Sequence, residues 1–216
     1  MKKVAVILSG SGVFDGAEIH EAVLALYAIE KEGASWHCFA PNIEQLHVIN
    51  HKTGEEMSES RNVLVESARI ARGKIEDVAK LNVDDFDALL LPGGFGAAKN
   101  LTDFAVKGAE CSINTHVASA CRAFANAGKP AGYLCIAPVI IPMIYKDQVK
   151  GTIGADEATG VAFNALGGEH VECAVNDYVY DQERKVLSTP AYMLAENISQ
   201  AASGIEKLVS KLIEIA

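Results

Sequence analysis

The chain has 216 residues, half of them apolar, and its formal net charge is −9. This length and composition allow one domain over residues 1–216, with a substantial core that needs no disulfide or metal ion. The acidic balance, without a basic stripe that carries interleaved aromatic residues, excludes nucleic acid as an expected partner.

No segment approaches the roughly 18 apolar residues of a membrane-spanning helix, so we expect no membrane partner. The apolar run at residues 4–8 is also shorter than the about 7–15 residues of a secretory signal, which predicts a cytoplasmic protein. The odd number of cysteines and the lack of a C-x-x-C motif indicate reduced thiols rather than a disulfide framework or a zinc site. The histidines show no ligand spacing, so no metal site is predicted.

Strands and helices are predicted to alternate through the first half of the chain. Buried strands are predicted at 3–9 and 35–41, and helices at 17–34 and 58–73. The first helix is expected to place Ile19, Val23, Leu26 and Ile29 on one buried face. Between the second strand and the second helix, residues 42–58 form an excursion, with a possible hairpin turn at 52–54.

The same alternation continues in the second half and defines the fold class. Strands are predicted at 87–96, 130–137 and 148–154, helices at 113–129, 156–168 and 195–215, and a hairpin within 170–190. Repeated strand–helix units imply parallel strands joined by crossovers. We therefore expect a flavodoxin-like three-layer α/β/α sandwich, mostly parallel, with a small hairpin near the C-terminus.

Ligands of such sheets bind beyond the carboxyl ends of the strands, which here are followed by residues 9–18, 92–100 and 134–138. Cys135 lies at the last of these strand ends. The start of a following helix would lower the pKa of its thiol and favour the nucleophilic thiolate, and backbone N–H groups of Gly94 and Ile136 could hold an oxyanion. The alternative is that Cys135 only fills the core, as many free cysteines do.

Two acids, Glu18 and Glu21, share one face of the first predicted helix, beside the same sheet edge. Either one is a general base close to Cys135, or both are solvated acids that the helix dipole favours. His20 lies between them, points elsewhere and is not favoured as a catalytic group. The glycines at 10, 12 and 16 do not match the dinucleotide fingerprint, so they are interpreted as tight turns and no cofactor is expected.

Several segments resemble one known family, in order and from the first strand to the last helix. They read VILSGSGVFDGAEIHEA, VINHKTGE, ESARIARG, LPGGFGAAKNL, LCIAP and STPAYMLAENI. They are similar to the ElbB-type, deglycase-like branch of the class I glutamine amidotransferase-like superfamily, also called isoprenoid biosynthesis proteins with an amidotransferase-like domain. The resemblance implies a cysteine on a nucleophile elbow, a homodimer, and a cofactor-free glyoxalase that converts glyoxal, a small dicarbonyl, to glycolate.

Carried over to this sequence, the resemblance places the nucleophile on Cys135 and its partner glutamate on Glu21, with Glu18 one turn earlier. The strand-end glycines are then Gly93 and Gly94. Glutaminases of this superfamily carry a late His-x-Glu, but residues 189–192 here contain no histidine, so glutaminase activity is not expected. Without a histidine base the glyoxalase would be slow. The alternative is a non-catalytic redox-sensing or partner-binding protein.

Overall fold

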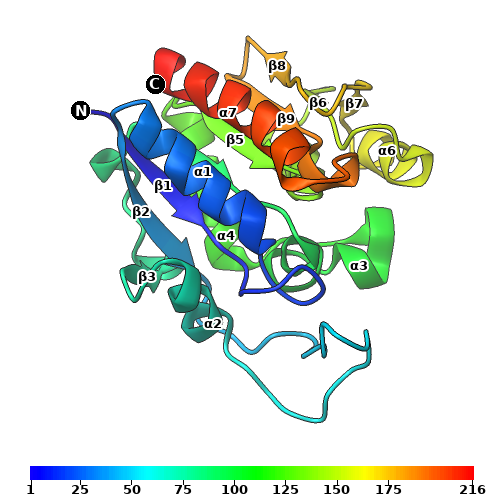
Figure 1. Ribbon diagram of the computed structural model, residues 1–216. Helices are drawn as coiled ribbons and strands as arrows, with labels where there is room; N and C mark the ends of the chain where they lie inside the picture. The colour runs from blue at the N-terminus through cyan, green and yellow to red at the C-terminus, as the bar shows by residue number, and fades with distance from the viewer.

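The computed structural model describes residues 1–216 and is built around a seven-stranded sheet (Figure 1). The strand order is β3-β2-β1-β4-β5-β9-β8, and every neighbouring pair is parallel except the antiparallel pair of β8 and β9. The strands are β1 (Lys3–Ile7), β2 (Ser35–Ala40), β3 (Ile75–Asp77), β4 (Ala88–Leu91), β5 (Ala131–Leu134), β8 (Val179–Asp181) and β9 (Val186–Thr189).

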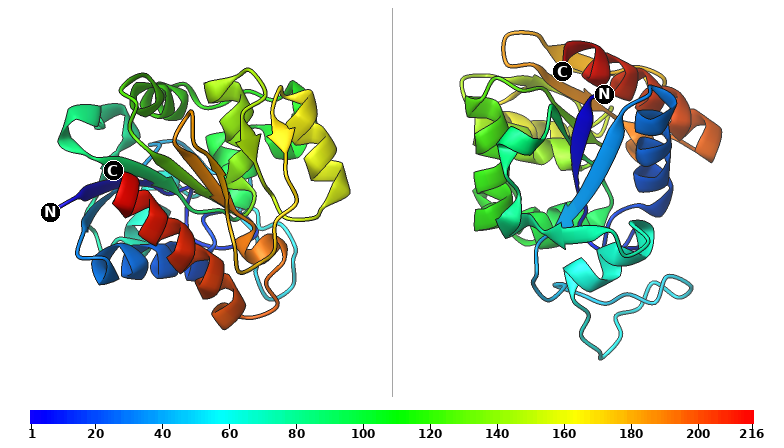
Figure 2. Two further views of the ribbon diagram at one scale, coloured as in Figure 1. Left: turned by 90° about the horizontal axis from the view of Figure 1, so that it is seen from above. Right: turned by 90° about the vertical axis from the view of Figure 1, so that its left-hand side faces the viewer.

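Helices cover both faces of this sheet. Figure 2 shows α1 and α7 together on one face, and the hydrophobic core places α4 and α5 on the other. Most of the longer helices begin after an N-cap residue whose side chain accepts a hydrogen bond from a backbone N–H, such as Asn114 at α4 and Asn197 at α7. The helices are α1 (Ile19–Lys31), α2 (Val63–Ile70), α3 (Phe104–Lys107), α4 (Thr115–Asn126), α5 (Ile141–Tyr145), α6 (Glu157–Ala165) and α7 (Ile198–Ile215).

Alternate residues of the strands fill two separate layers of the core. Val4 and Val6 of β1 pack in the cluster that includes α1 and α7, whereas Ala5 and Ile7 pack in the cluster that includes α4 and α5. The near-continuous apolar strands are thus buried on both faces, as a parallel sheet requires. The predicted flavodoxin-like three-layer sandwich is confirmed, and so is the C-terminal hairpin of β8 and β9.

The structure differs from the predicted elements in several places. Strand β3 and the short helices α3 and α5 were not predicted from the sequence. The strand expected at 148–154 contains only β6 (Lys150–Gly151), which pairs with β7 (Glu169–His170) in a separate two-stranded sheet. The excursion at 42–58 does form a hairpin, because Ile49 and Glu56 bridge in antiparallel fashion.

The buried face of α1 also differs from the expected one. Leu26 and Ile29 are buried as predicted, but Ile19 and Val23 are 43% and 50% exposed, and Glu21 is fully buried in their place. The helix is therefore rotated so that a carboxylic acid, rather than two aliphatic side chains, faces the sheet edge. None of the helices combines the length and the apolar character that crossing a membrane requires.

Candidate active site

The strand order reverses between β1 and β4, which brings three loops together at one edge of the sheet. After β1 the chain moves outward to β2 and β3, and then returns to place β4 and β5 on the other side of β1. Such a reversal opens a crevice beyond the carboxyl ends of the strands. The loops that follow β1, β4 and β5 meet there, and Cys135 follows the last residue of β5.

Cys135 has a strained backbone. Its φ of +59° lies in the left-handed region, which a residue with a Cβ adopts at a cost of roughly 1–3 kcal/mol. The backbone N–H of Cys135 donates to Thr189 O at 3.0 Å, which continues the pairing of β5 with β9 one residue beyond the strand. This hydrogen bond holds the turn at the point where the thiol meets the crevice.

Gly93 makes the contact between Cys135 and Glu21 possible. A Cβ at this position would collide with the Cβ of Cys135 and would lie 2.8 Å from Glu21 Oε2. Its backbone N–H donates to Glu21 Oε2 at 2.9 Å. Gly93 therefore acts through the absence of a side chain and through one hydrogen bond.

The Glu21 carboxyl is buried and held on both oxygens. Oε2 accepts from Gly93, Oε1 accepts from the backbone N–H of Tyr192 at 3.1 Å, and the carboxyl lies beside the Cys135 thiol. Burial raises the pKa of Glu21 to about 7, against the opposing effect of the backbone hydrogen bonds. A carboxyl with this pKa exchanges its proton at neutral pH.

Glu18 has a different position and a structural contact of its own. It is the N-cap of α1, and its Oε2 accepts from the backbone N–H of Glu21 at 2.7 Å. Its own N–H donates to Gly93 O at 3.0 Å. Glu18 therefore fixes the first turn of α1 and lines the crevice, whereas Glu21 is the acid that contacts the thiol.

The pKa of the Cys135 thiol is raised well above its ordinary value, in contrast to the expectation from sequence. Burial is the main cause, and the negative charge of Glu21 adds to it. The nearby backbone N–H groups of Gly94 and Ile136 act in the opposite direction. The helical segment after Cys135 begins with a 3₁₀ turn at Ala137–Ile140, and its dipole does not offset the burial.

Cys135 opens into a cavity of about 350 Å³ that thirteen residues line. Nine of these residues are hydrophobic, and none is a lysine, arginine or histidine. The structure brings Glu18, Gly94, Cys135 and Ile136 to this cavity directly, and Glu21 and Gly93 reach it through their contacts with Cys135. The hairpin at 42–58 does not line it.

Several residues of the cavity were not singled out from the sequence. Phe104 comes from α3, Asp156 and Thr159 from the start of α6, and Tyr192 and Met193 from the turn after β9. No short-range pattern marks them, because the fold alone brings these segments to Cys135. The sequence does show that residues 189–192 contain no histidine, and the residue of this segment that lines the cavity is Tyr192.

The remaining histidines and glycines lie outside the cavity. His20 Nδ1 is 2.9 Å from the Tyr192 hydroxyl, on the exposed side of that residue. His170 Nε2 accepts from Ile153 N at 3.3 Å. The glycine loop after β1 forms tight turns as interpreted, with Gly16 N donating to Gly12 O at 2.7 Å. No cluster of three or more His, Cys, Asp or Glu side chains is arranged to hold a metal ion.

Comparison with known proteins gives the family, although no family model matches the chain. The ES1 protein homolog, mitochondrial, of Rattus norvegicus is 44% identical over an alignment of 223 positions, which covers 99% of this chain and 84% of that protein. The glutamine amidotransferase-like class 1 domain-containing protein 3, mitochondrial, of Homo sapiens is also 44% identical, over 99% of this chain and 83% of its own length. The chain belongs to this ES1 family.

A solved structure agrees with this ES1 family assignment. The isoprenoid biosynthesis protein with amidotransferase-like domain from Ehrlichia chaffeensis superposes with a TM-score of 0.92 at 38% identity, over 99% of this chain and 100% of that one. Drosophila melanogaster DJ-1beta shares the fold alone, with a TM-score of 0.55 at 18% identity over 100% of this chain and 95% of that one. The resemblance to amidotransferase-like proteins is thus confirmed at the level of the family.

The predicted cytoplasmic location is wrong on the same comparison. The rat and human relatives in the ES1 family are named as mitochondrial proteins. So is the ES1 protein of Danio rerio, which is 34% identical over 88% of this chain and 76% of its own length. The lack of a signal-like run, from which the location was predicted, does not distinguish the cytoplasm from an organelle.

Proposed function

We propose that the protein is a cofactor-free glyoxalase of the ElbB type, which converts glyoxal and water to glycolate with Cys135 as nucleophile and Glu21 as base. The close approach of the buried Glu21 carboxyl to Cys135 at the wall of an open cavity carries the proposal. A buried carboxyl with a pKa of about 7 suits general acid–base catalysis at neutral pH.

In the first step, ionised Glu21 accepts the thiol proton while the Cys135 sulfur attacks one aldehyde carbon of glyoxal. A C–S bond forms, and the electron pair of the C=O bond moves to oxygen. The backbone N–H groups of Gly94 and Ile136 lie near the sulfur, which supports their role as donors to this oxyanion. The proton then passes from Glu21 to the oxyanion and completes a hemithioacetal.

In the second step, Glu21 removes the hydrogen of the sulfur-bearing carbon as a proton; the electron pair forms a C=C bond, and the π pair of the remaining C=O moves to its oxygen, which gives an enediolate. Glu21 then returns the proton to the neighbouring carbon, and the hydroxyl proton of the sulfur-bearing carbon passes to the enediolate oxygen, which gives the thioester of glycolate. One carbon is oxidised and its neighbour is reduced, so the step needs no external oxidant or reductant. Water then attacks the thioester, the C–S bond breaks, the sulfur takes a proton, and glycolate leaves.

The direct test is glycolate formation from glyoxal by the purified protein and two cysteine variants. We expect the wild-type protein and Cys173→Ser to form glycolate, and Cys135→Ala to lose this activity, because Cys173 lies outside the cavity. Equal turnover by Cys135→Ala would contradict the proposal. The rate is expected to be low, because no histidine lines the cavity.

We also propose that residues 1–216 act as one amidotransferase-like domain and that the protein is a homodimer. Ile19, Val23 and Tyr27 follow one another at helical spacing along α1, and each is 43% or more exposed. This apolar stripe supports association, and it also favours the second candidate function, a non-catalytic partner-binding protein. A redox-sensing role has less support, because sensor cysteines have low pKa values and Cys135 does not.

A further inference from the structure

The cavity beside Cys135 is far larger than glyoxal. Its volume of about 350 Å³ lies within the range of roughly 300–1,000 Å³ for small-molecule sites. In liquid water each molecule occupies about 30 Å³, so the cavity corresponds to about twelve water volumes. A two-carbon dialdehyde bound to the sulfur would leave most of this space to solvent.

The walls of the cavity are apolar where they extend away from the thiol. Phe95 from the loop after β4, Phe104 from α3 and Met193 from the turn after β9 line it together. Phe95 is 50% exposed, so its ring is not used to fill the core. Exposed aromatic side chains that line a concave surface are typical of a site that binds an apolar ligand.

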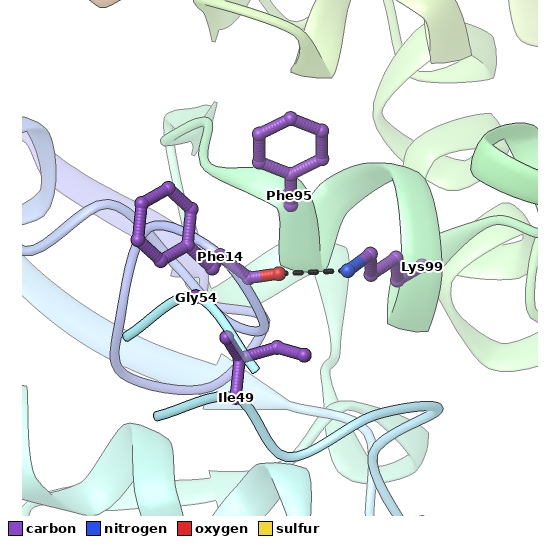
Figure 3. A pocket seen from close by; sticks show the side chains of 5 residues that line it. All are labelled: Phe14, Ile49, Gly54, Phe95 and Lys99. Atoms are coloured by element: carbon purple, nitrogen blue, oxygen red, sulfur yellow. Dashed lines mark hydrogen bonds between the residues drawn. The ribbon is translucent and has the colours of Figure 1, made fainter. Parts of the chain in front are cut away.

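The charged groups of the cavity are only acidic. Glu18 and Asp156 line it, and no cationic side chain does. Figure 3 shows a neighbouring shallow groove that shares Phe95, where Lys99 Nζ donates to Phe14 O at 2.8 Å. The Lys99 ammonium also lies 5.4 Å from the centroid of the Phe95 ring, so this cation is bound outside the cavity. The cavity therefore offers no cationic side chain to pair with an anionic substrate.

We infer that the cavity selects an uncharged 2-oxoaldehyde whose second substituent is apolar and of about phenyl size, with Phe104 as a specificity-determining residue. This inference rests on the proposed function and names the substrate class of the same site. The aldehyde carbon reacts with Cys135, and the substituent lies against Phe95, Phe104 and Met193. The product is a 2-hydroxy acid, whose carboxylate Glu18 and Asp156 repel, so the same acids favour its release.

The experiment compares kcat/KM for phenylglyoxal and for glyoxal in the wild-type protein, Phe104→Ala and Phe14→Ala. We expect the wild-type protein to prefer phenylglyoxal by about 10–100-fold, the range that modest differences in apolar contact produce. Phe104→Ala should lower this ratio by about tenfold or more. Phe14→Ala is the matched control, because Phe14 lines the neighbouring groove but not the cavity, and it should keep the ratio.

A charged analogue tests the role of the acids. We expect para-carboxyphenylglyoxal to react more slowly than phenylglyoxal, and Asp156→Asn to reduce that difference. Turnover of glyoxal without a preference for phenylglyoxal, or a preference that Phe104→Ala leaves intact, would overturn the inference and leave the proposed function standing. Failure of every dicarbonyl to react in a Cys135-dependent way would overturn both.

Discussion

The carboxyl group of Glu21 lies beside the thiol of Cys135, and both side chains are buried at the carboxyl edge of the sheet. The two residues are 114 positions apart in the chain, and Gly93, from a third loop, lets them meet. In this contact an ionised Glu21 opposes the thiolate, so the pair holds its proton at neutral pH until a substrate arrives. The chemistry proposed here depends on that shared proton.

The first prediction concerns the reactivity of the thiol. Glu21→Gln removes the negative charge that raises the pKa of Cys135, so iodoacetamide should alkylate Cys135 faster and at lower pH in the variant. The same substitution should lower turnover by about 10²–10⁴-fold, so reactivity and activity would change in opposite directions. Mass spectrometry of the alkylated peptides measures this, with the half-buried Cys173, which lies outside the cavity, as the internal control. An unchanged alkylation profile of Cys135 would show that the carboxyl does not act on the thiol.

The second prediction concerns stability against pH. The pKa of Glu21 is near its ordinary value of 4.5 in the unfolded chain and about 7 in the folded one, so the folded state binds the proton more tightly. The contribution of this carboxyl to stability is present below about pH 4.5 and is lost as the pH rises through about 7, by at most about 3 kcal/mol. The free energy of unfolding of the wild-type protein should therefore fall relative to that of Glu21→Gln between pH 5 and pH 8. A difference that does not vary with pH, measured by urea denaturation, would rule out the raised pKa.

The third prediction concerns Gly93. Gly93→Ala should destabilise the protein by about 1–3 kcal/mol and separate Glu21 from Cys135, because the new Cβ overlaps the Cβ of Cys135. Gly33→Ala is the control, since alanine is strained at the Gly33 φ of +72° but no atom lies within 4 Å of its would-be Cβ. Both variants should melt earlier than the wild-type protein, and only Gly93→Ala should lose glyoxal turnover. Full activity in Gly93→Ala would mean that the close approach is not needed.

The fourth prediction concerns Asn100, a buried side chain that ties two loops together. Its Nδ2 donates to Ser9 O and to Asp15 O, each at 2.8 Å, and its Oδ1 accepts from Leu46 N at 3.0 Å. Asn100→Ala should lower the free energy of unfolding by about 2–4 kcal/mol, because buried backbone groups lose their partners. The exposed capping residue Asn82 is the comparison, and Asn82→Ala should cost about 1 kcal/mol or less. Equal losses for the two variants would contradict this account of Asn100.

The layered fold could be predicted from the sequence because the strands that carry it are strongly apolar. The runs at β1, β4 and β5 are buried on both faces and leave little ambiguity. Strand β3 escaped prediction because it has only three residues, none of them fully buried. Helix α5 could not be predicted because its residues are apolar on all sides and show no helical period.

The site could be predicted only in part, for a related physical reason. From the rule that ligands bind beyond the strand ends, Cys135 and the acids of α1 could be predicted to lie at one edge of the sheet. The burial of Glu21 in place of Val23 could not be predicted from periodicity, because a buried carboxyl contradicts the pattern that periodicity detects. The raised pKa of Cys135 follows from the same burial, which the sequence does not show.

The most direct measurement is the pH profile of kcat/KM for glyoxal in the wild-type protein and in Glu21→Gln. If Glu21 is the base for Cys135, the wild-type value should rise with pH through a limb near pH 7, where the carboxyl ionises. In Glu21→Gln the limb should disappear and the value should fall by about 10²–10⁴-fold. A wild-type profile without that limb, or an active variant that retains it, would contradict the assignment of Glu21 and Cys135 as a base–nucleophile pair.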